Sequence, residues 1–354
     1  MIKSVYKVIG VMSGTSLDGL DLAYVEFNFD DSWSFKIIKA ETIEYSKEWK
    51  HILKNLVSNS LEELQVIDEE YAQYLAETIN NFIKQNTIDS IDAICSHGHT
   101  ALHQPEKGLT YQIGNLKELS TLTGQKVVCD FRVQDVKFGG QGAPLVPIGD
   151  KLLFQEYDYC INLGGFANIS TEIDNQRIAY DICPVNIVLN HYTLKLGFQY
   201  DNDGELAASG EINKQLLEEL NNLEFYKEEP PKSLGLEWVR DVIFPLIDKY
   251  KLETKDILRT FVEHSVFQIA QQINQNKNSI VFITGGGAYN LFLIKRLEEL
   301  TNCKIIVPSN TIVEYKEALI FGFLGVLRLR DENNCLASVT GAKQDHSSGN
   351  IYIP

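Results

Sequence analysis

One arrangement of elements occurs twice along the sequence. In each half a strand leads through a glycine-containing polar turn into two further strands, and helices follow. Apolar or alternating runs predict these strands, at residues 5–12, 22–29 and 34–43 in the first half and 157–163, 167–173 and 177–182 in the second. Strands followed by helices favour an α/β fold in which helices cover a sheet. We therefore expect an internal duplication, although an α/β protein can show such a pattern without one.

The duplication divides the chain into two domains. We predict an N-terminal domain at residues 1–150 and a C-terminal domain at 151–354, with the last helix able to pack on the first domain. The length of 354 residues agrees with this division, since domains average about 150 residues. Further predicted elements are helices at 47–59, 61–85 and 316–329 and short buried strands at 91–95, 126–129 and 279–284. Ser60 and Glu63 form a capping-box pattern at the start of the second helix.

Composition excludes several classes of protein. Hydrophobic residues make up 44% of the chain and charged residues 23%, which is typical of globular proteins rather than disordered or fibrous ones. The formal net charge is −16. A surface this acidic repels nucleic acids and anionic membranes, so we expect neither as a partner. An anionic substrate would need a local cluster of hydrogen-bond donors.

The cysteines and the apolar segments indicate the compartment. The six cysteines are scattered without a C-x-x-C pair, and most lie in apolar runs, so we expect free thiols in a reducing environment rather than disulfides or a zinc site. The N-terminal apolar stretch is too short for a secretory leader. No uncharged apolar run reaches about 18 residues. These features predict a cytoplasmic protein.

Residues 10–21 (GVMSGTSLDGLD) form the polar turn of the first half. Glycines at such a turn allow the backbone to approach phosphate oxygens, hydroxyl groups donate hydrogen bonds, and carboxylates hold Mg²⁺ through water. The glycines are Gly14 and Gly19, the hydroxyl groups those of Ser13, Thr15 and Ser16, and the carboxylates those of Asp18 and Asp21. A polar surface hairpin is the alternative. The Gly-Lys-Ser/Thr ending of a P-loop is missing.

Two further glycine turns belong to the second half. Gly164 and Gly165 follow the strand at 157–163, at the position equivalent to the first turn. Gly285, Gly286 and Gly287 follow the strand at 279–284 and precede a helix. Consecutive glycines there permit close packing of a ring or a phosphate at a helix N-terminus. A tight strand-to-helix turn is the alternative, although it requires only one glycine.

Polar residues also follow the short strands of the first half. Residues 96–103 contain three histidines, but without a nearby cysteine or carboxylate we do not favour a metal site there. Arg132 lies just after the strand at 126–129, and its forked guanidinium suits a carboxylate of a ligand. Salt bridges from Arg132 to Asp130 or Asp135 are the alternative.

Two carboxylates are candidates for acid–base chemistry. Asp181 ends the strand at 177–182, where a cleft-facing carboxylate would act as a general base. A helix N-cap before Pro184 is the alternative. Glu317 lies near the start of the last apolar helix, where it could equally be a first-turn acid favoured by the helix dipole.

Together these motifs resemble the anhydro-N-acetylmuramic acid kinases over nearly the whole chain. The segments that carry the resemblance are MSGTSLDG (12–19), SHGHT (96–100), DFR (130–132), GGQGAP (139–144), NLGG (162–165), TGGGA (284–288) and SVTGA (338–342). The resemblance implies the two-lobed sugar kinase/Hsp70/actin (ribonuclease H-like) fold, with duplicated βββαβαβα lobes and a central cleft. It also implies small-molecule substrates, ATP with Mg²⁺, a role in recycling cell-wall sugars and, often in this family, a homodimer.

The resemblance assigns roles to the candidate residues. The implied reaction opens the 1,6-anhydro bridge of the sugar with water and phosphorylates the released 6-oxygen, so one carboxylate base suffices; by resemblance that base is Asp181, with Glu317 assisting at the water. Phosphates and Mg²⁺ would be held by Gly14, Thr15, Ser16, Asp18, Gly19, Asp21, Gly164 and Gly165, with Asp18 at the metal. Gly285, Gly286 and Gly287 would border adenosine. Ser13, His99, Thr100 and Arg132 would bind the sugar.

One segment departs from the family pattern. After the strand-end Asp the family usually has Thr-Gly-Pro-Gly-Asn, whereas Asp181 is followed by ICPVN (182–186). If the missing glycines allow the backbone to approach the substrate, Cys183 and Val185 would narrow that wall. Two alternatives therefore stay open: a kinase of a related anhydro or amino sugar, and a non-catalytic ATP-binding regulator.

Overall fold

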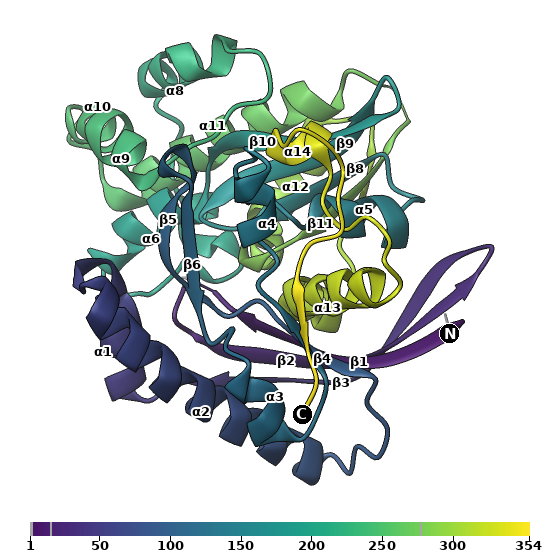
Figure 1. Ribbon diagram of the computed structural model, residues 1–354. Coiled ribbons are helices and arrows are strands. Elements are labelled where there is room, and N and C mark those ends of the chain that lie inside the picture. The colour runs from purple at the N-terminus through teal and green to yellow at the C-terminus, as the bar shows by residue number, and fades with distance from the viewer. Residues whose placement is uncertain (1–2, 15, 277) are drawn as a thin grey trace. The chain divides into compact units, whose positions relative to one another are not determined.

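The computed structural model describes residues 3–14, 16–276 and 278–354 (Figure 1). The chain forms two compact units, which are described separately. The first unit comprises Met1–Leu153 and Tyr315–Pro354, and the second comprises Phe154–Glu314. The predicted boundary after residue 150 lies close to Leu153, where the first segment of the first unit ends. The predicted second domain continued to residue 354, whereas the last 40 residues, 315–354, belong to the first unit.

The first unit contains a six-stranded sheet with the order β13-β7-β4-β1-β2-β3. Its strands are β1 (Val5–Ser13), β2 (Gly19–Asp30), β3 (Ser32–Glu44), β4 (Ala93–Ser96), β7 (Val127–Cys129) and β13 (Asn350–Tyr352). The first three form an antiparallel meander, whereas β4 runs parallel to β1 and β7 runs parallel to β4. The parallel strands therefore end at the same edge of the sheet as β1.

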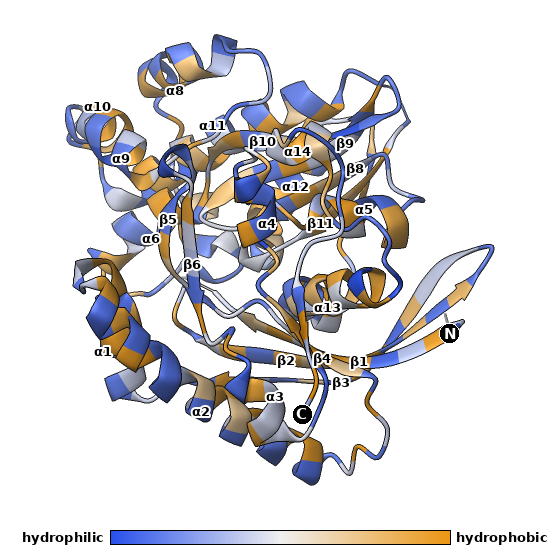
Figure 2. Cartoon of the chain, viewed as in Figure 1, coloured by the Kyte–Doolittle hydropathy of each residue, from blue (hydrophilic) through white to orange (hydrophobic). Residues whose placement is uncertain are grey.

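Helices and a small hairpin complete the first unit. They are α1 (Lys47–Lys54), α2 (Leu61–Gln85), α3 (Glu118–Thr123), α4 (Val133–Lys137), α5 (Pro147–Leu153), α13 (Asn310–Leu329, from Tyr315 onward in this unit) and α14 (Ala337–Thr340), with the hairpin β5 (His99–Gln104) and β6 (Leu109–Ile113). The predicted capping box is confirmed, because Ser60 accepts from the Glu63 amide and Glu63 accepts from the Ser60 amide. In Figure 2, α1 and α2 carry both hydrophilic and hydrophobic colours, as expected for helices with one buried face.

Alternate residues of β1 face opposite layers of helices. Ile9 and Val11 lie in the same buried cluster as Leu75 of α2. Gly10, which points to the other face, lies so close to α13 that a Cβ atom there would collide with the carbonyl oxygen of Ala318. The sheet is therefore enclosed by α2 on one face and α13 on the other (Figure 1), as the period of two residues in a strand requires.

The second unit contains a five-stranded sheet with the order β10-β9-β8-β11-β12. Its strands are β8 (Tyr159–Leu163), β9 (Phe166–Ile173), β10 (Gln176–Pro184), β11 (Ile280–Thr284) and β12 (Lys304–Ile306). Its helices are α6 (Asn186–Leu194), α7 (Glu205–Ser209), α8 (Lys214–Asn221), α9 (Leu236–Trp238), a π-helical turn (Val239–Ile243), α10 (Phe244–Asp248), α11 (Thr254–Ile273) and α12 (Leu291–Leu300). One large apolar cluster joins the sheet to α6 and α11.

The two sheets have the same topology. In each, the first three strands form an antiparallel meander, and the fourth and fifth run parallel to the first on its other side. The predicted duplication of α/β lobes is thus confirmed at the level of strand order. The first sheet differs by the added strand β13 at its edge.

Several elements were not predicted from the sequence. The hairpin β5–β6 and the three-residue strands β12 and β13 lack a long apolar run. The helix predicted at 47–59 ends at Lys54 and is followed by the 3₁₀ turn Leu56–Ser58, while α13 begins at Asn310 rather than at 316.

All six cysteines are free. Within the described ranges, none of the helices has the length and apolar character needed to cross a membrane.

Candidate active site

A hydrogen-bonded network in the first unit contains Ser13 and His99. Ser13 ends β1 and His99 begins β5, and the Ser13 Oγ lies 2.7 Å from the His99 Nδ1. The same Oγ lies 2.5 Å from the hydroxyl oxygen of Tyr45, which lies 2.8 Å from that of Tyr71. Burial lowers the pKa of His99 to about 4 and raises that of Tyr45 to about 12. The network is therefore neutral near pH 7 and presents hydroxyl and imidazole groups rather than charges.

Arg132 is held by two acceptors beside this network. Its Nε donates to the His97 Nε2 at 2.8 Å, and its Nη1 donates to the Gly142 carbonyl at 2.7 Å. The His97 Nδ1 lies 2.8 Å from the Gly98 carbonyl, so Nδ1 carries the proton and Nε2 is free to accept. Burial, and then the charge of Arg132, keep the His97 pKa well below 6.5.

These contacts answer two questions that the sequence left open. Both nitrogens of His97 are used within the protein, and the His99 Nδ1 faces Ser13, so these three atoms have partners in the protein. Among the described residues Arg132 forms no ion pair with Asp130 or Asp135, so the salt-bridge alternative is wrong. The guanidinium is oriented by neutral groups and keeps its charge for another partner.

Thr100 and Glu317 are the remaining candidates in the first unit. Thr100 is half-buried on β5, next to His99. Glu317 lies beyond the first turn of α13, so the first-turn alternative is wrong. Its side chain is accessible to solvent, yet surrounding protein raises its pKa above 4.5, while the charges of Arg132 and Lys316 act in the opposite direction. Glu317 and Arg132 thus lie within electrostatic range of each other.

The polar turn between β1 and β2 has an open and a packed part. Gly14 is half-buried with little around it, and Ser16 and Asp18 are exposed. Gly19 is paired in β2, where a Cβ atom would lie 2.6 Å from the Ile43 carbonyl oxygen. Asp21 also lies within β2 and accepts from the Thr42 hydroxyl at 2.7 Å. The close packing of β3 therefore explains why position 19 is a glycine. Thr15, which was also predicted to bind phosphate, lies outside the described residues.

The glycine turns of the second unit meet at the end of β8. Gly164 and Gly165 accept backbone hydrogen bonds from the start of α6, including one from Val185 to Gly165 at 2.8 Å. A Cβ atom on Gly285 would lie 2.5 Å from the Asn162 Oδ1, and one on Gly287 would lie 2.7 Å from the Leu163 Cβ. Because β8 and β11 are parallel neighbours, their ends place both turns side by side.

Within the three consecutive glycines, the middle one differs from its neighbours. Gly286 is exposed, and a Cβ atom there would meet nothing within 4 Å. Gly286 and Gly287 begin the 3₁₀ turn Gly286–Tyr289, and this turn precedes α12, whose N-cap is Asn290. Close packing against β8 accounts for Gly285 and Gly287, whereas Gly286 leaves an open backbone surface.

Asp181 lies in β10 of the second unit, at an irregularity in its pairing with β9. It is half-buried, and its Oδ2 accepts from the Leu234 amide at 2.8 Å. Its own amide donates to the Lys232 carbonyl at 2.9 Å. Burial raises its pKa above 3.8, and the hydrogen bond from Leu234 opposes that rise. The carboxylate is therefore partly desolvated and orientated by the loop that follows Pro231.

The segment after Asp181 corrects two expectations. The strand continues to Pro184, and Val185 is the N-cap position of α6, so the alternative of Asp181 as a helix N-cap is wrong. Cys183 and Val185 are fully buried in the apolar cluster of the second unit. Both side chains fill the core, whereas the sequence had led us to expect that they would narrow a substrate wall.

Several residues of the site were not selected from the sequence. His97, Tyr45, Tyr71, Gly142 and Leu234 orient candidate side chains through the contacts above. His97 lies within the polar segment 96–103, so that motif could have identified it. The two tyrosines and Leu234 carry no local signal, because their role depends on contacts with distant segments.

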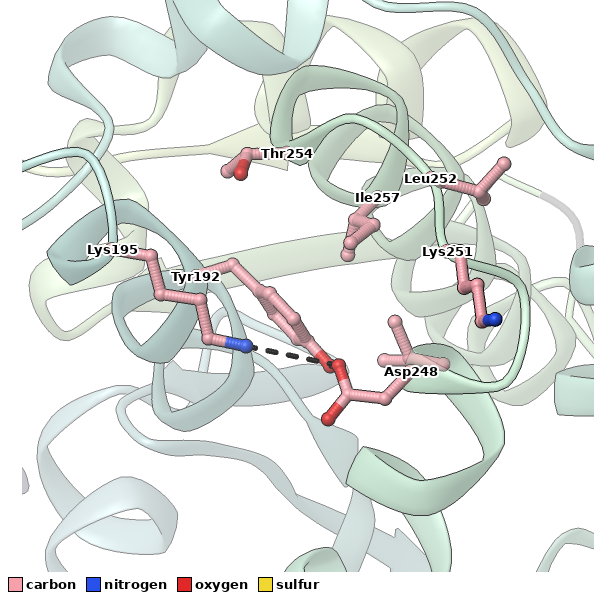
Figure 3. Close-up of a pocket in the computed structure, with 8 residues that line it drawn as sticks. Tyr192, Lys195, Asp248, Lys251, Leu252, Thr254 and Ile257 are labelled. Carbon is pink, nitrogen blue, oxygen red and sulfur yellow. Dashed lines mark hydrogen bonds and ion pairs between the residues drawn. The ribbon is translucent and has the colours of Figure 1, made fainter.

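The second unit contains a cavity of about 130 Å³. Figure 3 shows Tyr192 and Lys195 on one side and Asp248 on the other, with the Tyr192 hydroxyl 2.9 Å and the Lys195 Nζ 3.7 Å from the Asp248 carboxylate. The residues that line it include none of the predicted site residues that the structure describes. These contacts pair Tyr192 and Lys195 with Asp248.

The paired topology and the polar strand ends define an α/β protein of the sugar kinase/Hsp70/actin class. Comparisons with known proteins identify the family. The sequence model for "Anhydro-N-acetylmuramic acid kinase" matches residues 6–354. The chain belongs to the anhydro-N-acetylmuramic acid kinase family.

Two relatives and one solved structure illustrate the similarity. The kinase of that name from Sulfurimonas denitrificans is 34% identical, covering 97% of this chain and 98% of the relative. The one from Haemophilus influenzae is 32% identical, covering 97% of each. Among solved structures, the activator of 2-hydroxyisocaproyl-CoA dehydratase from Clostridium difficile is 11% identical with a TM-score of 0.42, covering 92% of this chain and 97% of that one.

Proposed function

We propose that this protein is an ATP-dependent kinase that opens 1,6-anhydro-N-acetylmuramic acid with water and phosphorylates its 6-oxygen. The products are N-acetylmuramate 6-phosphate and ADP. The observation that carries the proposal is the family match over residues 6–354. The two relatives named above bear this kinase name, and each of them aligns with the chain over almost its whole length. The geometry of each unit supports specific roles for its residues.

Asp181 acts as the general base in this proposal. It removes a proton from the water that attacks the anomeric carbon, and the bond from that carbon to the 6-oxygen breaks. The 6-oxygen then attacks the γ-phosphorus of ATP, the bond to the β-phosphate oxygen breaks, and ADP leaves. A carboxylate whose pKa is raised by burial is a stronger base than an exposed one, which supports this role.

Arg132 binds the lactyl carboxylate of the sugar. The support for this role is that its two acceptors, the His97 imidazole and the Gly142 carbonyl, are neutral, so no hydrogen-bonded carboxylate neutralises its positive charge. Ser13, His99 and Thr100 bind sugar hydroxyl and amide groups. The neutral state of His99 suits hydrogen bonding to uncharged groups. Glu317 assists in orienting the attacking water.

The glycine turns bind ATP and Mg²⁺. The open surfaces above Gly14 and Gly286 fit the close approach of a phosphate or a ring. Asp18 is exposed and hydrogen-bonds none of the residues that the structure describes, so its carboxylate oxygens fit a magnesium ion. When bound, Mg²⁺ neutralises charge on the phosphate oxygens. Thr15, Ser16, Gly19, Asp21, Gly164, Gly165, Gly285 and Gly287 complete the proposed nucleotide site.

The proposal includes partners and compartment. Both substrates are small molecules, and the acidic chain has no nucleic-acid or membrane partner. We place the protein in the cytoplasm, where ATP and recycled sugars are present, and consider a homodimer the expected assembly. Size-exclusion chromatography with light scattering measures that assembly directly.

The decisive experiment follows both oxygen and phosphorus. The protein is incubated with 1,6-anhydro-N-acetylmuramic acid, ATP and Mg²⁺ in ¹⁸O-labelled water. We expect a product that has gained one water and one phosphate, with the label on the anomeric hydroxyl. A phosphorylated sugar that keeps its anhydro bridge would contradict the hydrolytic step, and ADP release that does not depend on sugar would contradict the kinase assignment.

The same assay separates the alternatives. A kinase of a related sugar was an alternative because Cys183 and Val185 replace two glycines of the family pattern. Since both side chains lie in the core, the replacement gives little support to a different substrate. A panel of anhydro and amino sugars tests this alternative directly. Nucleotide binding without turnover of any sugar would indicate a regulator.

A further inference from the structure

Three side chains with metal-binding atoms meet inside the first unit, apart from the predicted site residues. They are Asp135, Cys335 and His346, and their carboxylate oxygen, sulfur and imidazole nitrogen lie within 4.8 Å of one another. The exposed fractions are 0% for Asp135, 1% for Cys335 and 4% for His346. Three potential metal ligands are therefore enclosed together.

The backbone brings two of these residues into position. Cys335 and His346 face each other across an isolated antiparallel bridge, in which each amide donates to the other's carbonyl, at 3.1 and 3.2 Å. Directly opposed residues of such a bridge project their side chains to the same side. Asp135 reaches the pair from α4. The cluster thus joins the C-terminal segment to a helix about 200 residues earlier in the chain.

His346 has a nitrogen without a hydrogen-bond partner. Its Nδ1 lies 3.1 Å from the Gln344 carbonyl, which can only accept, so Nδ1 carries the proton. In the tautomer protonated at Nδ1, the Nε2 bears a lone pair; it is buried and hydrogen-bonds none of the described residues. The Asp135 Oδ1 lies 3.6 Å from this nitrogen. A buried nitrogen without a partner that faces a carboxylate oxygen is where a shared cation, either a proton or a metal ion, would be satisfied.

The carboxylate and the thiol restrict the choice. Asp135 already accepts from the Thr340 hydroxyl through Oδ1 and from the Gly142 amide through Oδ2, both at 2.7 Å, which holds the carboxylate in a fixed orientation. Cys335 faces the same enclosed space, and its sulfur lies within 4.8 Å of the carboxylate oxygen and the imidazole nitrogen. A bound metal ion would take this sulfur as a thiolate and release its proton.

We propose that Asp135, Cys335 and His346 form a binding site for a divalent transition-metal ion of the Zn²⁺ type. Cysteine sulfur, histidine nitrogen and aspartate oxygen are the ligands that zinc takes in proteins, and three of them leave a fourth position for water or another group. Mg²⁺ and Ca²⁺ prefer oxygen ligands and would not select a thiol. The site is therefore separate from the magnesium site of the proposed kinase reaction, and its existence does not rest on that reaction.

The metal ion would have a structural role. It would fasten the segment that contains Cys335 and His346 to α4, at the carboxylate that also accepts from the Gly142 amide. The Gly142 carbonyl in turn accepts from Arg132. Occupancy would therefore stabilise the loop that orients Arg132, without placing the metal ion next to the reacting atoms.

Cobalt(II) provides a direct test, because its thiolate complexes absorb in the near ultraviolet. The full chain is stripped with a chelator and titrated with CoCl₂. We expect one equivalent to bind with a thiolate charge-transfer band, and one equivalent of Zn²⁺ to remove the band. Cys335→Ser should abolish the band, and His346→Gln should weaken Co²⁺ binding at least about tenfold. Cys303→Ser is the matched control, because Cys303 is a partly exposed cysteine of the second unit, and it should leave the band unchanged.

The outcomes separate the metal site from a buried histidine–aspartate pair. No band in the stripped wild-type protein would overturn the proposal and assign the cation to a proton on His346. A band that persists in Cys335→Ser would also overturn it. If the variants do not fold, as judged by circular dichroism, crystals of the wild-type protein grown with Zn²⁺ give an independent measurement. Anomalous scattering at the zinc edge should then locate the ion between the three side chains, and a peak elsewhere or none would refute the assignment. None of these readouts uses kinase activity.

Discussion

The Nε of Arg132 donates a 2.8 Å hydrogen bond to the Nε2 of His97, and this bond fixes both groups. The imidazole can accept because its other nitrogen donates to the Gly98 carbonyl. The guanidinium is thereby oriented without a neutralising carboxylate. A charged side chain prepared in this way is suited to bind an anionic group of a ligand.

Replacement of Arg132 should weaken sugar binding selectively. Arg132→Ala is expected to raise the KM for the anhydro sugar by at least about tenfold, the loss typical of a charge-assisted hydrogen bond. The KM for ATP should change far less. Steady-state kinetics with each substrate varied in turn measure both. Arg132→Lys keeps the charge but not the forked geometry, so its KM for the sugar should fall between those of the wild type and Arg132→Ala. An equal rise of both KM values would place Arg132 outside the sugar site.

His97 should act through Arg132. His97→Phe keeps a ring that can pack against Phe321, whose centroid lies 4.5 Å from that of His97, but it removes the acceptor. We expect the KM for the sugar to rise, by less than in Arg132→Ala, with the KM for ATP unchanged. His97→Gln offers an amide oxygen and should restore part of the loss. If Gln and Phe at this position behave alike, the hydrogen bond does not position Arg132.

Loss of the Asp181 carboxylate should stop the chemistry but spare nucleotide binding. Asp181→Asn is expected to lower the sugar-dependent rate by at least about 10²-fold, while calorimetry shows ATP affinity largely retained. Asp174→Asn is the control, because Asp174 is an exposed turn residue between β9 and β10. Substantial turnover in Asp181→Asn would remove it as the base. In the wild type, the acid limb of kcat/KM should lie above pH 3.8, since burial raises the Asp181 pKa.

Burial of His99 should make the protein less stable in mild acid. Its pKa is lowered from 6.5 to about 4, so below pH 6.5 the unfolded chain binds a proton that the folded protein does not. The free energy of unfolding therefore falls as the pH drops from 6.5 toward 4. Thermal unfolding at pH 7 and pH 5 should show this loss, and His99→Gln should reduce the difference. His51→Gln, at an exposed position of α1, should leave the stability difference between the two pH values unchanged. If His99→Gln also left this difference unchanged, the buried imidazole of His99 would not be its cause.

Two glycines at one interface should respond in opposite ways to alanine. Gly10→Ala introduces a collision with the Ala318 carbonyl oxygen and should lower the free energy of unfolding by about 1–3 kcal/mol. Gly322→Ala, on α13 at the same interface, meets the Val8 Cγ2 at 3.4 Å, which is ordinary contact. Because alanine favours a helix over glycine by up to about 1 kcal/mol, Gly322→Ala should be neutral or stabilising. Chemical denaturation measures both, and equal losses would contradict the packing described here.

Local sequence signals predicted most of the regular structure. Long apolar runs and the capping box at Ser60 mark strands and helices through interactions between near neighbours. Strands such as β13 were missed because their three residues form a strand only by pairing with β7. The same limit applies to the site. Ser13 and His99 were both selected, but their 2.7 Å contact depends on β1 and β4 lying side by side.

The sequence could not decide whether Asp181 ends a strand or caps a helix, for a different reason. Spacing alone could not separate a strand-end carboxylate from a helix cap, since Pro184 is compatible with both. The backbone decides between them by continuing β10 to Pro184. The partner of the carboxylate, Leu234, lies 53 residues further along the chain, beyond a loop whose course no local pattern predicts.

The pairing of β13 with β7 gives the end of the chain a protective function. Strand edges with unsatisfied amides and carbonyls recruit other strands and promote aggregation. Asn350–Tyr352 cover that side of β7 in the folded protein. A chain shortened before Asn350 would expose it, so such truncations should self-associate, and affinity tags for this enzyme are better placed elsewhere than immediately after Tyr352.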